Sequence, residues 1–275
     1  MKDFCTIPES EYLLFKPVLK AIISVTAKYD LKFILIGAAA RDILIKFVYH
    51  CDIQYRATLD IDFAVMLQNW ESFQNIIDDL VSQHGFEKGK EQHRLRFESI
   101  IVDIIPFGKI AKHNAIYWPP DEDIIMNIIG FQEVYDQAIQ CRLNSLSFKT
   151  TCLEGFVILK LIAWNDRKLV TAKDAEDLGI IFYNYNELFP DELFEDYSYL
   201  IDDPDYDYIL AGIIILAKKL KIFISHSKEL RSQIISILTT ELEDKDNSLL
   251  ARKINKIEKY EYSYEILKTI LDQIS

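Results

Sequence analysis

The chain has 275 residues, of which 50% are hydrophobic, so it is long enough for two ordinary domains with a buried core. Its formal net charge is -12 and its pI is near 4.9, which argues against broad electrostatic attraction to nucleic acid. The four cysteines are widely spaced and the five histidines are scattered, so neither a disulfide framework nor a zinc site is suggested. The N-terminus lacks an apolar core of signal-peptide length, and lysines interrupt the most apolar stretch, residues 208–224. We therefore expect a cytoplasmic protein without a membrane segment.

The first third of the sequence alternates helical and strand patterns. Residues 11–29 have apolar side chains at helical spacing, which predicts an amphipathic helix. Residues 32–36 are mostly β-branched or aromatic and predict a strand, after which Gly37 and three alanines predict a tight turn and the start of a helix. Residues 59–65 alternate apolar residues with Asp60, Asp62 and an alanine, the period of a half-buried strand.

The pattern changes along the rest of the chain. Residues 70–85 predict another helix, and residues 93–105 predict two strands, the second ending at Pro106. A loop at 118–123 and a short strand at 144–148 come before a region that is helical after about residue 153. We therefore predict an α+β fold, with a small mixed-sheet core at residues 1–110 flanked by helices, and a mainly helical domain at residues 111–275.

Three aspartates form the clearest chemical pattern. Asp60 and Asp62 share one face of their strand, roughly 6 to 7 Å apart, which suits divalent cations such as Mg²⁺ that prefer oxygen ligands. Asp103 lies in an apolar run, where an ionised carboxylate is costly unless it is paired with a metal or hydrogen-bonded. We predict that these three residues bind Mg²⁺, with Asp103 also a candidate proton acceptor. The alternative for Asp103 is a structural carboxylate bonded to the backbone or to Arg94 or Arg96 across the hairpin.

The turn at Gly37 is a candidate phosphate site. A glycine there lets the backbone approach a triphosphate, and the following helix offers unpaired N–H groups beginning near Ala38. Arg41 lies on the first turns of that helix, within reach of a phosphate. The alternative for Arg41 is a pair with Asp42 on the helix surface.

These residues in this order resemble the nucleotidyltransferase superfamily of the polymerase-beta type and, more narrowly, the AbiEii/AbiGii-type toxin nucleotidyltransferases. The narrower resemblance is carried by IGAAARD at 36–42, RATLDIDFAV at 56–65, VDIIPFG at 102–108, LKLIAWNDR at 159–167 and AKDAEDL at 172–178. It implies binding of a nucleoside triphosphate with Mg²⁺ and transfer of a nucleotide, usually within an antitoxin-controlled system. It also implies that Lys160, Lys173, Asp174 and Asp177 form the second, helical half of the active-site cleft.

The sequence departs from the superfamily pattern at two points. Ala38 stands where serine or glycine is usual, so a hydroxyl that often holds phosphate is missing. The 22 residues between Gly37 and Asp60 exceed the usual spacing and predict a longer helix and an added loop at 49–55.

The downstream helical segments also suggest phosphate binding. Lys160, Trp164 and Arg167 fall at i, i+4 and i+7 of a helix, so two cations flank an aromatic ring that is suited to stacking on a base. A solvated helix face is the alternative for the two cations, and a core position is the alternative for Trp164. Lys173 and Asp177 are also spaced as an ordinary i,i+4 salt bridge.

The leading functional hypothesis is transfer of a nucleoside monophosphate to an acceptor hydroxyl. A tRNA end, a protein side chain and a small hydroxylated molecule all stay open as acceptors, although the acidic composition mildly disfavours tRNA. The alternative is a catalytically silent module that binds a nucleotide or a protein partner. A toxin bound by an antitoxin protein is compatible with the leading hypothesis.

Overall fold

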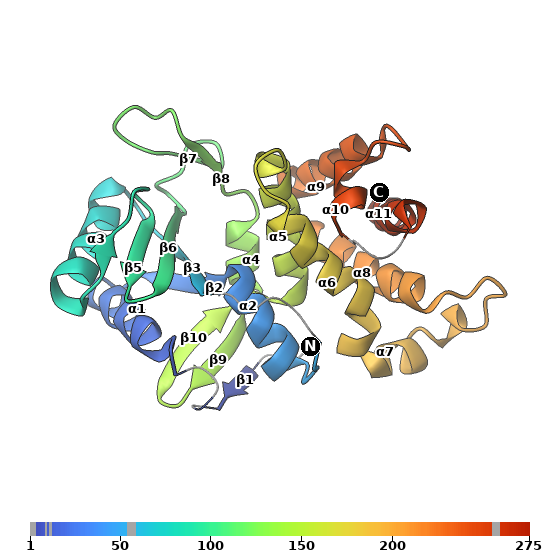
Figure 1. The fold of residues 1–275 in the computed structure, drawn as a ribbon, viewed down its shortest axis with the longest axis horizontal. Helices are drawn as coiled ribbons and strands as arrows, with labels where there is room; N and C mark the ends of the chain where they lie inside the picture. The colour runs from blue at the N-terminus through green and yellow to red at the C-terminus, as the bar shows by residue number, and fades with distance from the viewer. Residues whose placement is uncertain (1–3, 9, 11–12, 54–58, 255–258) are drawn as a thin grey trace. The chain divides into compact units, whose positions relative to one another are not determined.

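The computed structural model describes residues 4–8, 10, 13–53, 59–254 and 259–275, which form two compact units (Figure 1). Unit 1 comprises Met1–Val48 and Arg56–Phe156, and unit 2 comprises Tyr49–Tyr55 and Val157–Ser275. The division falls within the helix α5 (Leu153–Arg167), whereas the expected boundary near residue 110 lies inside unit 1. None of the described helices combines the length and apolar composition that crossing a bilayer requires.

Unit 1 is built on an eight-stranded mixed sheet with the strand order β1-β9-β10-β2-β3-β6-β5-β4. Its strands are β1 (Phe4–Ile7), β2 (Lys32–Ile36), β3 (Asp60–Met66), β4 (Glu87–Lys88), β5 (Arg94–Phe97), β6 (Ile100–Phe107), β9 (Ile139–Leu143) and β10 (Leu146–Thr150). β3 lies between β2, to which it is antiparallel, and β6, to which it is parallel. The predicted α+β class, a mixed sheet flanked by helices, is confirmed. β6 continues through Pro106, at which the sequence analysis ended it.

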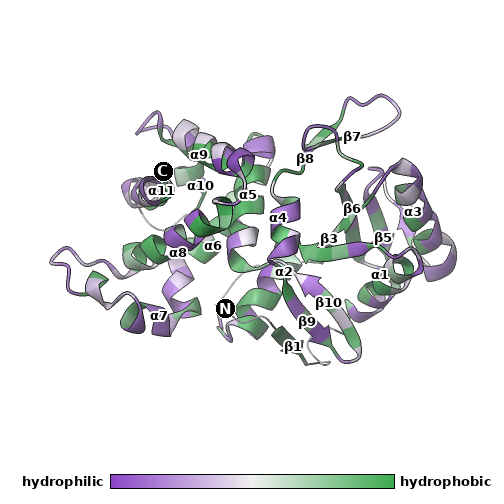
Figure 2. Ribbon diagram, turned by 180° about the vertical axis from the view of Figure 1, so that it is seen from behind, coloured by the Kyte–Doolittle hydropathy of each residue, from purple (hydrophilic) through white to green (hydrophobic). Residues whose placement is uncertain are grey.

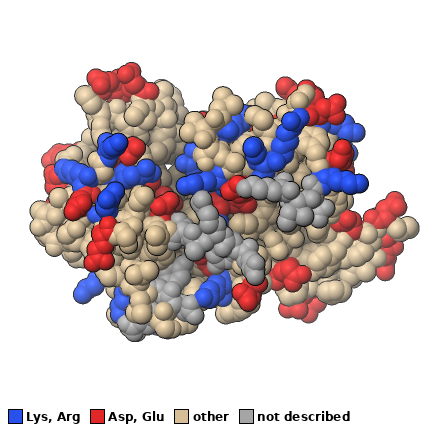
Figure 3. Space-filling model, viewed as in Figure 1, with Lys and Arg blue, Asp and Glu red and all other residues tan. Residues whose placement is uncertain are grey.

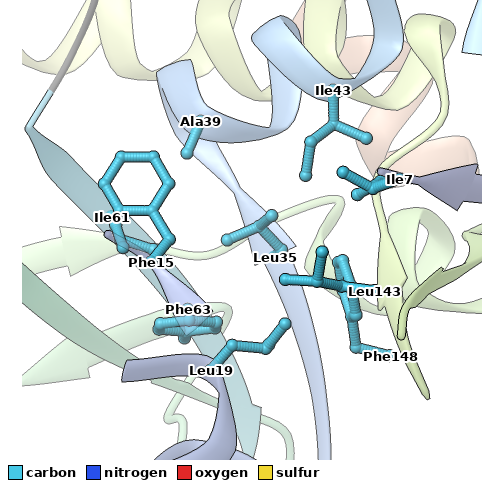
Figure 4. A pocket seen from close by; sticks show the side chains of 10 residues that line it. All are labelled: Ile7, Phe15, Leu19, Leu35, Ala39, Ile43, Ile61, Phe63, Leu143 and Phe148. Atoms are coloured by element: carbon cyan, nitrogen blue, oxygen red, sulfur yellow. The ribbon is translucent and has the colours of Figure 1, made fainter. Parts of the chain in front are cut away.

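The two faces of β3 have opposite character, because successive side chains of a strand point to opposite sides. Ile61 and Phe63 point toward α1 (Lys16–Lys28) and α2 (Gly37–Ile43), where they line a small apolar cavity together with Leu35 (Figure 4). Asp60 and Asp62 therefore point to the other side of the sheet. The apolar packing on one face holds β3 in the register that presents its carboxylates on the other.

Helix α1 begins later than the sequence pattern predicted. Pro17 occupies its first turn, a position where the missing N–H costs nothing. Leu13 and Leu14, which were predicted to belong to the apolar face of the helix, lie in the preceding turn with 59% and 66% of their surface exposed. Residues 11 and 12 of the predicted helix lie outside the described residues.

Helix α3 (Trp70–His84) agrees with the prediction at both ends. The Asn69 side chain caps its N-terminus by accepting a hydrogen bond from the Ser72 N–H at 2.9 Å. Gly85 ends the helix in the left-handed region, with φ of +76°. The outer face of α3 is hydrophilic in Figure 2, as expected of a helix with one side against a sheet.

The segment between β6 and β9 contains three elements that were not predicted, and they lie on either side of the predicted loop at 118–123. β7 (Ala115–Tyr117) and β8 (Ile125–Asn127) form a two-stranded ribbon, and α4 (Phe131–Asp136) follows it. The acidic tip at residues 121–123 is visible as red atoms at the upper left of Figure 3. Trp118 directly follows β7, where its backbone N–H donates to the Ile124 carbonyl at 3.1 Å, and its side chain is buried against Trp70 and Phe73, so it is a packing residue.

Unit 2 is helical, as predicted for the region after residue 153. Besides most of α5, its helical elements are α6 (Lys173–Leu188), α7 (Pro190–Glu195), η3 (Ser198–Leu200), α8 (Tyr208–Ile224), α9 (Lys228–Leu242), α10 (Leu249–Ile254) and α11 (Tyr260–Ile274). The hydrophobic α8 packs against α6 and α11 (Figure 2). α8 is therefore the core helix that its apolar composition suggested.

Glu241 is a buried carboxylate that ties three helices of unit 2 together. It accepts hydrogen bonds from Trp164 on α5 at 3.0 Å, from Lys168 at 2.8 Å and from the Leu250 N–H of α10 at 2.9 Å. Burial by itself would raise the pKa of Glu241, but the hydrogen bonds from Lys168, Leu250 and Trp164 together outweigh it and lower the pKa below its usual value. The network therefore stabilises the ionised form.

We expect Glu241→Gln to lower the free energy of unfolding at pH 7 by about 1–3 kcal/mol, because an amide presents a donor to groups that are themselves donors. A depressed folded-state pKa contributes stability that is present above the unfolded pKa, about 4.3, and is lost as the pH falls through the folded value. Urea unfolding at pH 7 and near pH 3 measures the difference in the free energy of unfolding between wild type and variant. We expect this difference to be smaller near pH 3. Glu243→Gln, at an exposed position beside the same helix, is the control. An unchanged difference would contradict the prediction.

Candidate active site

Three carboxylates lie on one face of the sheet in unit 1. Asp60 and Asp62 flank the buried Ile61 on β3, and Asp62 stands directly opposite Asp103 in the parallel pairing of β3 with β6. Paired residues of neighbouring strands point to the same side, and such strands lie about 4.8 Å apart. The structure therefore places the three predicted carboxylates side by side.

Gly37 contacts the central carboxylate of this row. Ile36 pairs with Asp62 across β2 and β3, and the chain then turns at Gly37 with φ of +71° into α2. A Cβ atom at position 37 would lie 1.9 Å from Oδ2 of Asp62, far inside contact distance. The Asp62 carboxylate thus rests on the backbone of Gly37, and both the φ angle and this contact require glycine. The predicted strand, turn and helix start are confirmed.

The first turns of α2 carry the other candidate phosphate ligands. Ala38 is half-buried directly after the turn. Arg41 is only 2% exposed, and its Nε and Nη2 atoms donate to Oδ1 of Asp42 at 2.9 and 2.6 Å. The pair with Asp42 therefore forms, but its arginine is buried and does not lie on the helix surface.

Asp103 has a strong partner in Arg94, which faces it across the antiparallel pairing of β5 and β6. The Arg94 Nε donates to Oδ1 at 2.9 Å and Nη2 donates to Oδ2 at 2.8 Å, so the ion pair is bidentate. The hydrogen bond to Asp103 raises the pKa of Arg94, which stays protonated. The alternative partner named for Asp103 in the sequence analysis is thus present.

The donor set suits a hard divalent cation, since aspartate oxygens are the ligands that Mg²⁺ prefers and it commonly uses one or two carboxylates. Among the described residues, however, no group of three or more His, Cys, Asp or Glu side chains takes up a metal-binding arrangement. Arg94 engages both oxygens of Asp103. Asp60 and Asp62 are two carboxylates of the kind that such an ion binds.

Unit 2 brings four of its five predicted site residues into one cluster. The Lys160 Nζ lies 3.0 Å from Oδ1 of Asp174 and 2.6 Å from Oδ2 of Asp177. Arg167 donates to both oxygens of Asp174, at 2.6 and 2.8 Å. Asp174 and Asp177 therefore share a helix face, as predicted, and both cations of α5 meet that face.

The cluster keeps its charges in spite of its burial. Burial would lower the pKa of Lys160, but the charges of Asp177 and Asp174 outweigh it and raise the pKa. Burial would likewise raise the pKa of Asp174, but the hydrogen bond from Arg167 and the charge of Lys160 lower it. Removal of one partner would leave a buried charge uncompensated.

Two expectations for these helices change. Lys173 is exposed, and Asp177 pairs with Lys160 on α5 in place of the i,i+4 pair with Lys173. Trp164 is only 1% exposed and donates its indole N–H to Glu241, so it is a core residue and does not present its ring for base stacking. The core alternative for Trp164 is the one that the structure supports.

Arg94 is the residue that sequence reasoning undervalued. It entered only as an alternative partner of Asp103, although its place in a short strand before a tight turn was a usable signal. Two strands joined by a turn at Glu98 and Ser99 set Arg94 opposite Asp103 once the turn length is known. The turn has φ of +52° at Glu98, which fixes that register.

A glycine turn against two alternating aspartates, with a third aspartate on the neighbouring parallel strand, is the arrangement expected of a nucleotidyltransferase. The family model described as nucleotidyl transferase AbiEii toxin, type IV toxin-antitoxin system, matches residues 20–256. The chain belongs to this family and is a nucleotidyltransferase. No curated relative matches the sequence.

Two solved structures are similar to this chain at low identity. The antibiotic-resistance factor ANT(2'')-Ia is 13% identical, with 69% of this chain and 96% of that chain covered and a TM-score of 0.39. An antigenic nucleotidyltransferase-like protein from Paracoccidioides brasiliensis is 17% identical, with 88% and 94% covered and a TM-score of 0.42. The assignment to the family is carried by the family model.

We expect Gly37→Ala to destabilise unit 1 more than Gly85→Ala does. Both glycines have positive φ, but a Cβ at position 85 meets nothing within 4 Å, so that control measures backbone strain alone, about 1 kcal/mol. Alanine at position 37 must also displace the Asp62 carboxylate, which should cost at least about 1 kcal/mol more. Urea unfolding of the two variants measures the difference. If both variants lost the same free energy of unfolding, the Asp62 side chain would move away from the alanine at position 37 at no cost, and the contact with Gly37 would not contribute to stability.

Proposed function

We propose that this nucleotidyltransferase transfers a nucleoside monophosphate from a nucleoside triphosphate to an acceptor hydroxyl, with Mg²⁺ required. The acceptor oxygen bonds to the α-phosphorus, the bond from that phosphorus to the pyrophosphate oxygen breaks, and pyrophosphate leaves with the electron pair. Bound Mg²⁺ would neutralise charge that develops on the phosphate oxygens. The acceptor hydroxyl also loses its proton, so a nearby base is needed.

The proposal gives each predicted site residue of unit 1 a role. Asp60 and Asp62 would bind the metal, and Asp103 would either bind metal or accept the proton of the acceptor hydroxyl. Gly37 and Ala38 would approach the triphosphate through their backbone, and Arg41 would contribute positive charge. The observation that most supports the proposal is the contact between Asp62 and Gly37, because it joins a side chain that would bind the metal directly to the turn that would bind phosphate.

We also propose that the charged residues of α5 and α6 take part in nucleotide binding. Arg167 supports this role, since 53% of its side chain is exposed although its guanidinium is held by Asp174. Lys160 would be positioned by Asp174 and Asp177, and the exposed Lys173 would add a further cation. Arginine held in place in this way loses little side-chain entropy when it binds a phosphate.

The partners of this activity would be a nucleoside triphosphate, an acceptor and, by analogy with the family description, an antitoxin protein. The acceptor would be a tRNA, a protein or a small hydroxylated molecule, of which tRNA fits the net charge of -12 least well. The expected location is the cytoplasm. A silent nucleotide-binding module is the alternative, and it predicts triphosphate binding without release of pyrophosphate.

We expect the double variant Asp60→Asn, Asp62→Asn to lose nucleotide transfer by on the order of 100-fold or more, as is typical when groups that stabilise transition-state charge are removed. The measurement is Mg²⁺-dependent labelling of total RNA, protein and small-molecule fractions of a lysate with each radiolabelled triphosphate. Asp123→Asn, which removes an exposed carboxylate from the acidic loop, is the control. Undiminished labelling by the double variant would contradict the catalytic role proposed for Asp60 and Asp62.

We expect Arg167→Gln to weaken binding of a nucleoside triphosphate by about tenfold while unit 2 stays folded, because Lys160 still pairs with both aspartates. Calorimetry with a non-hydrolysable triphosphate measures the affinity, and circular dichroism checks the fold. Lys228→Gln, at an exposed position on α9, is the control for loss of one positive charge. The same affinity in wild type and Arg167→Gln would leave Arg167 as a structural partner of Asp174 only.

A further inference from the structure

Arg94 lies in the same row of paired residues as the central carboxylates of the sheet. The pairings of β5, β6, β3 and β2 align Arg94 with Asp103, Asp103 with Asp62, and Asp62 with Ile36. All four residues point to one face, since paired residues of neighbouring strands share a side. The guanidinium therefore approaches the carboxylate row from the β5 side.

The ion pair with Arg94 engages both oxygens of Asp103. Each of its oxygens accepts one N–H from Arg94, and only 13% of its side chain is exposed. A divalent cation held between Asp62 and Asp103 would need an oxygen of Asp103 and would stand close to a guanidinium of the same sign. The two cations cannot both bind Asp103 at full strength.

A second carboxylate is available to Arg94 when it leaves Asp103. Oε2 of Glu91 lies 3.7 Å from the Arg94 Nη1, and 46% of the Glu91 side chain is exposed. Of the Arg94 side chain, 39% is exposed, so the guanidinium has room to turn toward Glu91. A change of one side-chain rotamer of Arg94 would exchange the bidentate pair with Asp103 for a pair with Glu91.

We propose that Arg94 is a positioning residue that competes with the divalent cation for Asp103, so that metal binding requires Arg94 to release this carboxylate. The inference rests on the proposed function, because it assumes that Asp60 and Asp62 bind the cation. In the absence of metal, Arg94 neutralises Asp103 and holds it in place. In the presence of metal, Asp103 turns to the cation and Arg94 pairs with Glu91.

The strand offers a matched control for this inference. Arg96 lies two residues from Arg94, on the same strand and the same face, but its partner across the sheet is Ile101. Arg96→Ala removes the same charge without freeing Asp103. A comparison of the two alanine variants therefore separates a specific competition from a general change of electrostatic field.

The test is to titrate the full chain with Mn²⁺ in the absence of nucleotide. The electron paramagnetic resonance signal of free Mn²⁺ measures how much of the ion stays unbound. We expect Arg94→Ala to bind Mn²⁺ about tenfold more tightly than wild type, equivalent to about 1.4 kcal/mol, and Arg96→Ala to bind it like wild type. Arg94→Lys should also bind more tightly than wild type, because lysine lacks the planar fork that occupies both oxygens. If Arg94→Ala fails to fold, Arg94→Lys tests by itself whether Arg94 competes with the cation for Asp103.

If folded Arg94 variants bound Mn²⁺ as wild type does or more weakly, Arg94 would not compete with the cation for Asp103. An equal increase of Mn²⁺ affinity in Arg96→Ala would contradict the inference as well. Asp60→Asn, Asp62→Asn tests the underlying site separately. If this variant bound Mn²⁺ as well as wild type does, the proposed metal site itself would fail, whatever the Arg94 variants showed. If it lost Mn²⁺ and the Arg94 variants matched wild type, only the role of Arg94 would fall.

Discussion

The contact between the Asp62 carboxylate and the backbone of Gly37 is the constraint on which the geometry of unit 1 depends. It forces residue 37 to have no side chain and a positive φ, and so it sets where β2 ends and α2 begins. It also fixes β3 in register against β2, and the parallel pairing with β6 then brings Asp103 beside Asp62. The turn at Gly37, between β2 and α2, thus meets β3 at the position of the Asp62 carboxylate.

Electrostatics divide the charged groups of the chain into two kinds. In unit 2, the buried Lys160 pairs with Asp174 and Asp177, and the partly exposed Arg167 also pairs with Asp174. In unit 1, Arg94 engages one carboxylate from the solvent side of the sheet and is itself partly exposed. A charge at such a half-exposed site can exchange partners at lower cost than one in a buried cluster. Arg94 and Arg167 are therefore the partly exposed charges that can exchange partners, whereas Lys160 and Asp174 are buried.

Much of the fold could be predicted because its main elements have strong local signals. β2, β3, α3 and the helices after residue 153 follow from periodicity, caps and glycine positions. The short pieces β1, β7, β8, β9 and α4 were missed, since three to six residues carry too little periodicity. β1 in addition depends on pairing with the distant β9. The late start of α1 was missed because Leu13 and Leu14 fit the apolar pattern, while Pro17 decides where the helix begins.

The sequence by itself determined the candidate site: the aspartates at 60, 62 and 103, the glycine before them and the charged residues of α5 and α6, which we propose carry the chemistry. Residue type and local spacing indicate the aspartates and the glycine, because alternation along a strand and turns of a helix are short-range properties. The charged residues of α5 and α6 were assigned mainly from the family resemblance. The tertiary structure alone decided the partners. Arg94 meets Asp103, Lys160 meets Asp177 and Trp164 is buried against Glu241, since each pair joins elements whose approach depends on strand register or helix packing.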